Sequence, residues 1–304
     1  MLSKVKSVPE KVRPKVLNAL RWSNRTNRNR AIALGLIICL CYLPTWLRLI
    51  GIDLARGSSF PILNLGFLFF GIQALLKYRK EADTFELSPE DQLLASLAVI
   101  TGGGLFFISL DSSSFQALGC AIAVAGTLFL TFSLRLFTHY PLKLSLLFFS
   151  LYPSLTYLLN NIRLLVTGDS MEVVAAYLGN FGLNLLGQSS HVDGILISLG
   201  EGSVEVGSGC SGFDMAVPIA GFAFMLGLFF ELKWTKTLLL TVVGVGLALL
   251  LNIPRIMVLA NAAVYWGEDS FYFWHDSWGA QIFSGILFTI YYYVAMPIIG
   301  ENAK

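Results

Sequence analysis

Three residue types in the C-terminal third of this sequence could together carry out chemistry: a cysteine, an arginine and a histidine. Cys210 stands in the turn GSGCSG, after a strand-like run and before a long apolar run. A thiolate can attack a backbone carbonyl to give a thioester when a base assists and the oxyanion is stabilised. A histidine can move the proton, and an arginine can stabilise either the thiolate or the oxyanion. The three residue types are therefore sufficient for nucleophilic acyl transfer.

Arg255 and His275 are expected at the same depth as Cys210. Arg255 lies near the end of the apolar stretch LLLNIPRIMVLANAAVYW. Arginine at the centre of a membrane span costs roughly 2.5–3.5 kcal/mol, and less near an interface, so its presence favours a functional role over headgroup snorkelling. Asn252 is expected on the same helical face, and Pro254 is expected to kink the helix there.

Two acidic neighbours are left out of the predicted catalytic set. Asp214, in the first turn after Cys210, would oppose thiolate formation if it faced the sulfur. Asp276 follows His275 directly, so on a helix it would point elsewhere and cap the next helix.

The other three cysteines, Cys39, Cys41 and Cys120, lie in apolar stretches where a thiol behaves as a small hydrophobic group. Cys210 differs because its flanking serines, Ser208 and Ser211, could each begin the following helix as the N-cap. Amide groups of a first helical turn favour the thiolate. From these features alone a nucleophile is only somewhat favoured over an unreactive cysteine.

Apolar helices must position these residues. The 304 residues are 55% hydrophobic and 13% charged, with a mean hydropathy of +0.69, which excludes an ordinary soluble domain. Apolar blocks long enough to cross about 30 Å of hydrocarbon recur along the chain. They predict eight spans at Ala31–Ile50, Phe60–Leu76, Leu93–Leu110, Gln116–Leu136, Leu142–Leu159, Phe213–Phe230, Thr237–Ala260 and Trp278–Ile299. The predicted fold is an all-α polytopic membrane protein.

The basic residues predict the orientation in the membrane. Positive loops face the cytoplasm. All of the 21 Lys and Arg residues lie in or beside alternate loops except Arg48, Arg56, Arg163 and Arg255. With eight spans this places both termini in the cytoplasm and Cys210, Arg255 and His275 on the extracytoplasmic side of a plasma or inner membrane.

Four regions are expected along the chain: a basic cytoplasmic segment 1–30, five spans in 31–159, an extracytoplasmic loop 160–212 and three spans in 213–304. The loop contains apolar residues at helical spacing over 170–187, which predict an amphipathic helix. In the sequence HVDGILISLGEGSVEVGSG, the runs ILISL and SVEV flank a Gly-Glu-Gly turn and predict a β-hairpin leading to Cys210.

The motif order resembles that of the exosortase/archaeosortase family of membrane proteases and transpeptidases. The residues that carry the resemblance are CSG at 210–212, N-x-x-R-I at 252–256, and His275 with Gly279 following it. The resemblance covers residues 160–283 by motif and the first four spans by hydropathy only. It implies the eight-span layout and the β-hairpin before the cysteine.

The resemblance also implies a catalytic set of Cys210, Arg255 and His275, with Asn252, Ser211 and Gly212 in support. The implied partners are exported proteins that end in a short motif, one transmembrane helix and a basic tail, met within the lipid bilayer. Ser208-Gly209 and Phe213-Asp214, however, replace the flanks of the commonest exosortase pattern. This departure suggests a divergent branch, such as the cyanobacterial one.

Other classes fit the sequence less well. His139, His191 and His275 are far apart and no HExxH motif is present, so no metal or other cofactor is expected. No GxSxG motif indicates a serine hydrolase, and nucleic acid is not expected as a partner. The remaining alternative is a transporter or membrane assembly subunit that binds an anionic ligand at Arg255. Transporters usually place polar groups near mid-membrane in two related halves, whereas here the polar groups gather near one surface.

Overall fold

The computed structural model describes residues 26–81, 87–152 and 155–300. Residues 1–25 of the predicted basic segment 1–30 therefore lie outside the described residues. The chain divides into two compact units, one within Met1–Arg48 and Phe67–Pro153, the other within Leu49–Gly66 and Ser154–Lys304. The second unit contains every residue of the predicted catalytic set.

The first described part of the chain is helical throughout. Its helices are α2 (Asn27–Ala55), α3 (Phe60–Glu81), α4 (Pro89–Ile108), α5 (Ser113–Phe132), α6 (Arg135–His139) and α7 (Pro141–Leu151). Helix α4 begins at Pro89 because Ser88 caps it. The Ser88 side chain accepts a hydrogen bond from the Asp91 amide at 3.1 Å, and proline is favoured at the first helical position. Helices α4 and α5 pack along each other.

The described residues include six helices long and apolar enough to cross a membrane, and these confirm an all-α polytopic membrane protein. The helices α7 and α10 (Phe213–Phe229) are apolar but shorter. The predicted fifth span, Leu142–Leu159, is wrong in extent, because α7 ends at Leu151 and a separate helix α8 begins at Leu155. Tyr152 has extended backbone angles (φ −81°, ψ 112°), as expected for a residue that precedes a proline.

The second unit follows the order helix, sheet, helices. Its remaining elements are α8 (Leu155–Thr167), α9 (Ser170–Leu185), β1 (Ser190–Asp193), β2 (Leu196–Leu199), β3 (Gly202–Glu205), the 3₁₀ turn η2 (Ser208–Cys210), α10, α11 (Trp234–Asn261), the π-helical turn η3 (Ala262–Trp266), α12 (Glu268–His275) and α13 (Ser277–Gly300). Helix α9 confirms the predicted amphipathic helix to within two residues.

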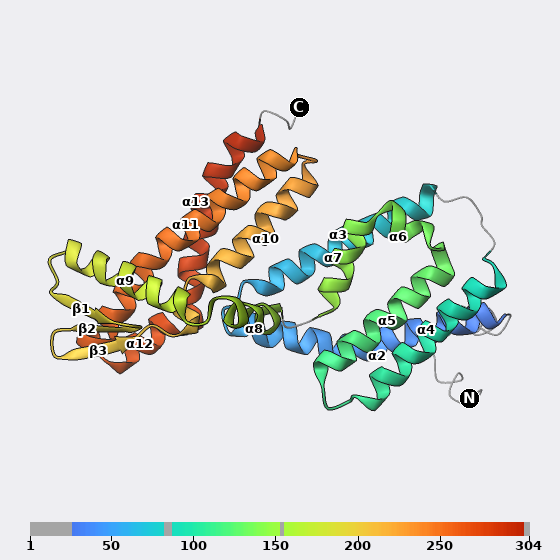
Figure 1. Cartoon of the computed structure of the whole chain (residues 1–304), viewed down its shortest axis with the longest axis horizontal. Coiled ribbons are helices and arrows are strands. Elements are labelled where there is room, and N and C mark those ends of the chain that lie inside the picture. Colours follow the sequence, from blue (N-terminus) through green and yellow to red (C-terminus); the bar gives the residue numbers. More distant parts are fainter. Residues whose placement is uncertain (1–25, 82–86, 153–154, 301–304) are drawn as a thin grey trace, which may run out of the picture. The chain divides into compact units, whose positions relative to one another are not determined.

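Helices α10, α11 and α13 form the core of this unit (Figure 1). Ile219, Leu240, Leu287 and Tyr291 are almost fully buried between them. The Tyr291 hydroxyl donates to the carbonyl oxygen of Leu240 at 3.2 Å, so the polar end of this buried ring is satisfied. The three helices thus form a fixed support for the turn that carries Cys210.

The strands form a three-stranded antiparallel sheet in the order β1-β2-β3. The predicted hairpin is β2-β3 and is confirmed, but the prediction missed β1, which pairs with β2 over Ser190–Asp193. Strand β1 is short, and its sequence SHVD is too polar to indicate a strand. The buried face of the sheet packs its side chains Ile197 and Leu199 against α9 and α11, and Val206, just after β3, joins the same buried cluster. The sheet therefore packs on α11, the helix that carries Arg255.

Candidate active site

Cys210 is the last residue of the 3₁₀ turn η2. Its backbone amide donates to the carbonyl oxygen of Gly207 at 2.9 Å, and the Ser211 hydroxyl donates to the carbonyl oxygen of Ser208 at 2.8 Å. Helix α10 begins only at Phe213, with Gly212 as its N-cap residue in place of the expected serine. The thiol therefore precedes the first turn of α10.

Gly212 and Asn252 fix the far side of this turn. Gly212 has φ +83°, a left-handed conformation that favours glycine. A Cβ atom at Gly212 would lie 3.1 Å from the side-chain nitrogen of Asn252. That nitrogen donates a 2.8 Å hydrogen bond to the carbonyl oxygen of Cys210. The supporting residues predicted from sequence thus meet around the backbone of Cys210.

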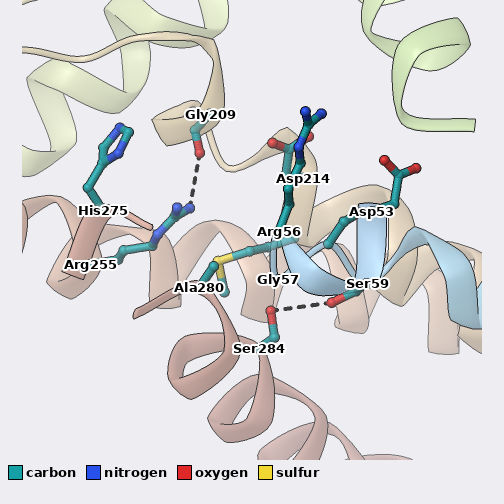
Figure 2. A pocket seen from close by; sticks show the side chains of 12 residues that line it. Asp53, Arg56, Gly57, Ser59, Gly209, Asp214, Arg255, His275, Ala280 and Ser284 are labelled. Carbon is teal, nitrogen blue, oxygen red and sulfur yellow. Dashed lines mark hydrogen bonds between the residues drawn. The ribbon is translucent and has the colours of Figure 1, made fainter. Parts of the chain in front are cut away.

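Arg255 lies three residues after Asn252, on the buried stripe of α11. Its side chain is only 6% exposed, and Nη1 donates to the carbonyl oxygen of Gly209 at 3.1 Å (Figure 2). Its Nε is buried and has no hydrogen-bond partner within the described part of the chain. The guanidinium also lines a cavity beside this turn, where its positive charge can stabilise a developing oxyanion.

His275 is the last residue of α12. Its ring stacks on that of Phe271, with centroids 5.1 Å apart and an interplanar angle of 23°. Its Nδ1 lies 3.3 Å from a carboxylate oxygen of Asp276. The expectation that Asp276 points away is wrong, because Asp276 ends α12 with extended backbone angles (φ −82°, ψ −162°). A carboxylate at Nδ1 can orient the imidazole.

Two cavities meet the turn. The smaller, about 40 Å³, is lined by Cys210 and His275 together with Val204, Glu205 and Val206 at the end of β3. The larger, about 260 Å³, is lined by Gly209, Arg255 and His275. Cys210 and His275 thus line the smaller cavity, and Arg255 and His275 line the larger one.

The larger cavity contains charged residues that the sequence analysis did not assign. Asp53 and Arg56, near the junction of α2 and α3, line it together with Asp214 of α10 (Figure 2). A hydrogen bond of 3.4 Å joins the Ser59 and Ser284 hydroxyls of the same wall. The sequence signal for Arg56 was its place among the four basic residues outside the cytoplasmic loops; for Asp53 there was none.

Gly57 lets this wall approach α13. It has φ +77°, and a Cβ atom there would lie 2.8 Å from backbone atoms of Ser277. The backbone of the α2–α3 junction therefore touches the start of α13 directly, which brings Asp53 and Arg56 to the cavity.

The charges around Cys210 oppose one another. Burial raises the pKa of the Cys210 thiol, the Arg255 guanidinium lowers it, and the Asp214 carboxylate raises it. The net effect is a pKa above the usual value, so the resting thiol is protonated and needs a base. Asp214 thus opposes thiolate formation, as expected from the sequence. The expected stabilisation of the thiolate by the amide groups of the first turn of α10 does not produce a thiolate here.

A buried ion pair lies near α10. The Arg163 guanidinium of α8 forms an ion pair of 2.7 Å with Glu172 of α9, and both side chains are at least 95% buried. Arg163 also donates to the Asn160 side chain at 3.0 Å and stands over the Phe213 ring at 5.8 Å. This pair joins α8 and α9 to the first residue of α10; the sequence analysis did not assign it.

The fold and site define a polytopic membrane protein with a buried thiol at one end of its helices. The sequence model of the transmembrane exosortase family matches residues 58–292. The chain belongs to this family. The comparisons with curated proteins and with solved structures found no match. The cyanobacterial branch stays a prediction.

Proposed function

We propose that this protein is a membrane cysteine protease or transpeptidase that cleaves the C-terminal sorting signal of exported proteins through a thioester at Cys210. The observation that carries the proposal is the shared cavity of Cys210 and His275, beside a buried Arg255 bound to the carbonyl oxygen of Gly209. The family match supports the general class of activity.

In the first step, His275 removes the proton of the Cys210 thiol, and the sulfur attacks the scissile carbonyl. The carbonyl π-electrons move to oxygen, and the positive charge of the Arg255 guanidinium, which lines the larger cavity, stabilises this oxyanion. When the carbonyl re-forms, the C–N bond breaks and His275 gives its proton to the leaving amine. The products are a Cys210 thioester and a released C-terminal segment.

In the second step, water or an acceptor amine attacks the thioester. His275 removes the proton of this nucleophile, and the C–S bond breaks with return of the thiolate. Reprotonation of Cys210 by His275 restores the resting state, consistent with a thiol pKa raised by burial. Asp276 holds Nδ1 of His275 in both steps, so Nε2 is the ring nitrogen that moves the proton.

The alternative, a transporter or assembly subunit that binds an anion at Arg255, receives less support. The cavity at Arg255 contains two aspartates, Asp53 and Asp214, besides two arginines. A site of balanced charge has no electrostatic preference for an anion.

The test uses a tagged exported reporter ending in a motif, one apolar helix and a basic tail, taken from an exported protein of the same cell. Co-expression with the parent protein should give a shortened reporter, whose new C-terminus is read by mass spectrometry. Cys210→Ala should abolish shortening with normal expression, and Arg255→Lys should fail badly because an ammonium lacks the planar fork. Normal processing by Cys210→Ala would refute the nucleophile.

The proposal also fixes the depth of the scissile bond. The apolar helix would hold the reporter in the bilayer, and its basic tail would set the height of the bond. Four residues inserted between motif and helix would move the bond by roughly 6 Å if helical, more than a catalytic site tolerates. Processing should fall sharply; equal processing with and without the insertion would contradict a depth-fixed cut.

A further inference from the structure

Strand β3 is an edge of the sheet, and its outer side carries backbone groups that β2 does not use. The amide of Val206 donates to the carbonyl oxygen of Ile195 at 2.8 Å, in register with the β2-β3 pairing. Directly bonded pairs alternate along an antiparallel ladder. Val204 and Gly202 therefore also bond to β2, whereas the amides and carbonyls of Ser203 and Glu205 point to the outer edge.

These outward groups are open within the described part of the chain. No backbone hydrogen bond to Ser203 or Glu205 joins them to another described segment, and both side chains are exposed. A row of free amides and carbonyls on an edge strand is a template for another extended chain. Nearby, η3 packs its Val264 side chain against Gly202, on the buried face of the sheet.

The open edge leads directly to the nucleophile. Glu205 and Val206 at its end line the same small cavity as Cys210 and His275. Phe271 of α12 also lines that cavity and stacks on His275. An extended chain lying along β3 would therefore run into the space between the thiol and the imidazole.

We infer that the outer edge of β3 binds the substrate, as a fourth strand formed by the extended segment beside the scissile bond. This inference rests on the proposed function and specifies its substrate-binding site. The ligand is an unfolded peptide segment with free backbone amides at alternate positions, recognised by main-chain hydrogen bonds to Ser203 and Glu205. Pairing with these two residues sets the register and thus selects the bond that reaches Cys210.

The test measures binding without chemistry. The parent for cross-linking carries Cys210→Ala, Cys39→Ala, Cys41→Ala and Cys120→Ala, which leaves it with no native cysteine. Ser203→Cys or Glu205→Cys is added on β3. The matched control is Asp193→Cys, an exposed residue of β1 on the opposite edge of the same sheet. The probe is the tagged reporter with one cysteine moved residue by residue through the segment before its helix, and a short thiol-to-thiol cross-linker is applied.

The expected result is a several-fold preference for links from the β3 positions over the β1 control. Alternate reporter positions should link best, because every second side chain of a strand faces the same way. Moving the enzyme cysteine from Glu205 to Ser203 should shift the best reporter position by two residues. This shift distinguishes a strand in fixed register from a flexible segment held nearby.

Three results would overturn the inference. Equal linking from β1 and β3, or linking without alternation or shift, would exclude strand pairing. Absence of links while the protein with native Cys210 still shortens the reporter would refute the β3 edge and leave the proposed function intact. A reporter that is neither shortened nor linked would count against both.

Discussion

The side-chain amide of Asn252 donates a hydrogen bond of 2.8 Å to the carbonyl oxygen of Cys210. It joins α11 to the turn that carries Cys210 across 42 residues of sequence. Asn252 is 3% exposed, and its own carbonyl oxygen has no partner among the described residues. Asn252 thus holds the backbone of Cys210 from the helix that also carries Arg255.

Asn252→Ala should slow processing by roughly two- to tenfold, the range expected for one hydrogen bond of about 0.5–1.5 kcal/mol. Pulse-chase labelling of the reporter measures the rate. The matched control is Asn261→Ala on the same helix, whose amide bonds instead to Gln188 at 3.1 Å. An equal effect of both substitutions would indicate a general loss of stability rather than loss of the contact to Cys210.

The pH dependence of thiol alkylation should change in opposite directions in two variants. Asp214→Asn removes a charge that raises the pKa of Cys210, so alkylation should begin at lower pH. Arg255→Gln removes a charge that lowers the same pKa, so alkylation should need higher pH. Iodoacetamide, which is uncharged, is applied to proteins whose other three cysteines are alanine.

The control for this titration is Asp53→Asn, a carboxylate of the larger cavity that is not among the influences on Cys210. Its alkylation profile should match that of the parent. Shifts of the same sign in Asp214→Asn and Arg255→Gln would contradict the electrostatic account.

The orientation in the membrane can be tested at exposed positions. Cys210 itself is only 7% exposed, so a bulky impermeant maleimide should react with it slowly. Asp193→Cys on β1 should be labelled in intact cells, and Lys233→Cys, just before α11, only after permeabilisation. Both are measured without the native cysteines, and the reverse pattern would invert the predicted topology.

The buried pair Arg163–Glu172 should matter for stability. Arg163→Ala leaves the Glu172 carboxylate buried without its partner, a loss of about 3–5 kcal/mol. The midpoint of denaturation in detergent should fall accordingly. Arg163→Met combined with Glu172→Leu replaces both charges with apolar groups and should recover most of the stability. Unchanged unfolding of Arg163→Ala would show that the ion pair contributes nothing.

Hydropathy and motif order predicted much of this protein. Apolar block length located the helices, and the order of a cysteine, an arginine and a histidine predicted residues that the structure brings together around two adjacent cavities. The first signal is local, since a helix forms its hydrogen bonds within one segment. The end of α7 at Leu151 could have been read from Pro153, which disfavours helix in the preceding residue.

The features that were missed depend on contacts distant in sequence. Asp53 and Arg56 reach the cavity only because Gly57 touches Ser277, and no sequence pattern links these positions. Glu172 is a polar residue of an amphipathic helix and looks solvated until Arg163 is found beside it. The position of Asp276 follows from an extended residue between two helices, a break that apolar periodicity does not reveal.

The contact of Gly57 with Ser277 has a consequence for shortening this protein. Leu49–Gly66 belongs to the same compact unit as the thiol turn, although most of the first unit comes after it in sequence. A fragment that begins after residue 66 would retain Cys210, Arg255 and His275 but lose the wall that Asp53 and Arg56 contribute to the cavity of Arg255 and His275. A minimal version of the second unit would therefore have to be assembled from two separate pieces of the chain, with Leu49–Gly66 supplied as its own peptide or rejoined through a new linker.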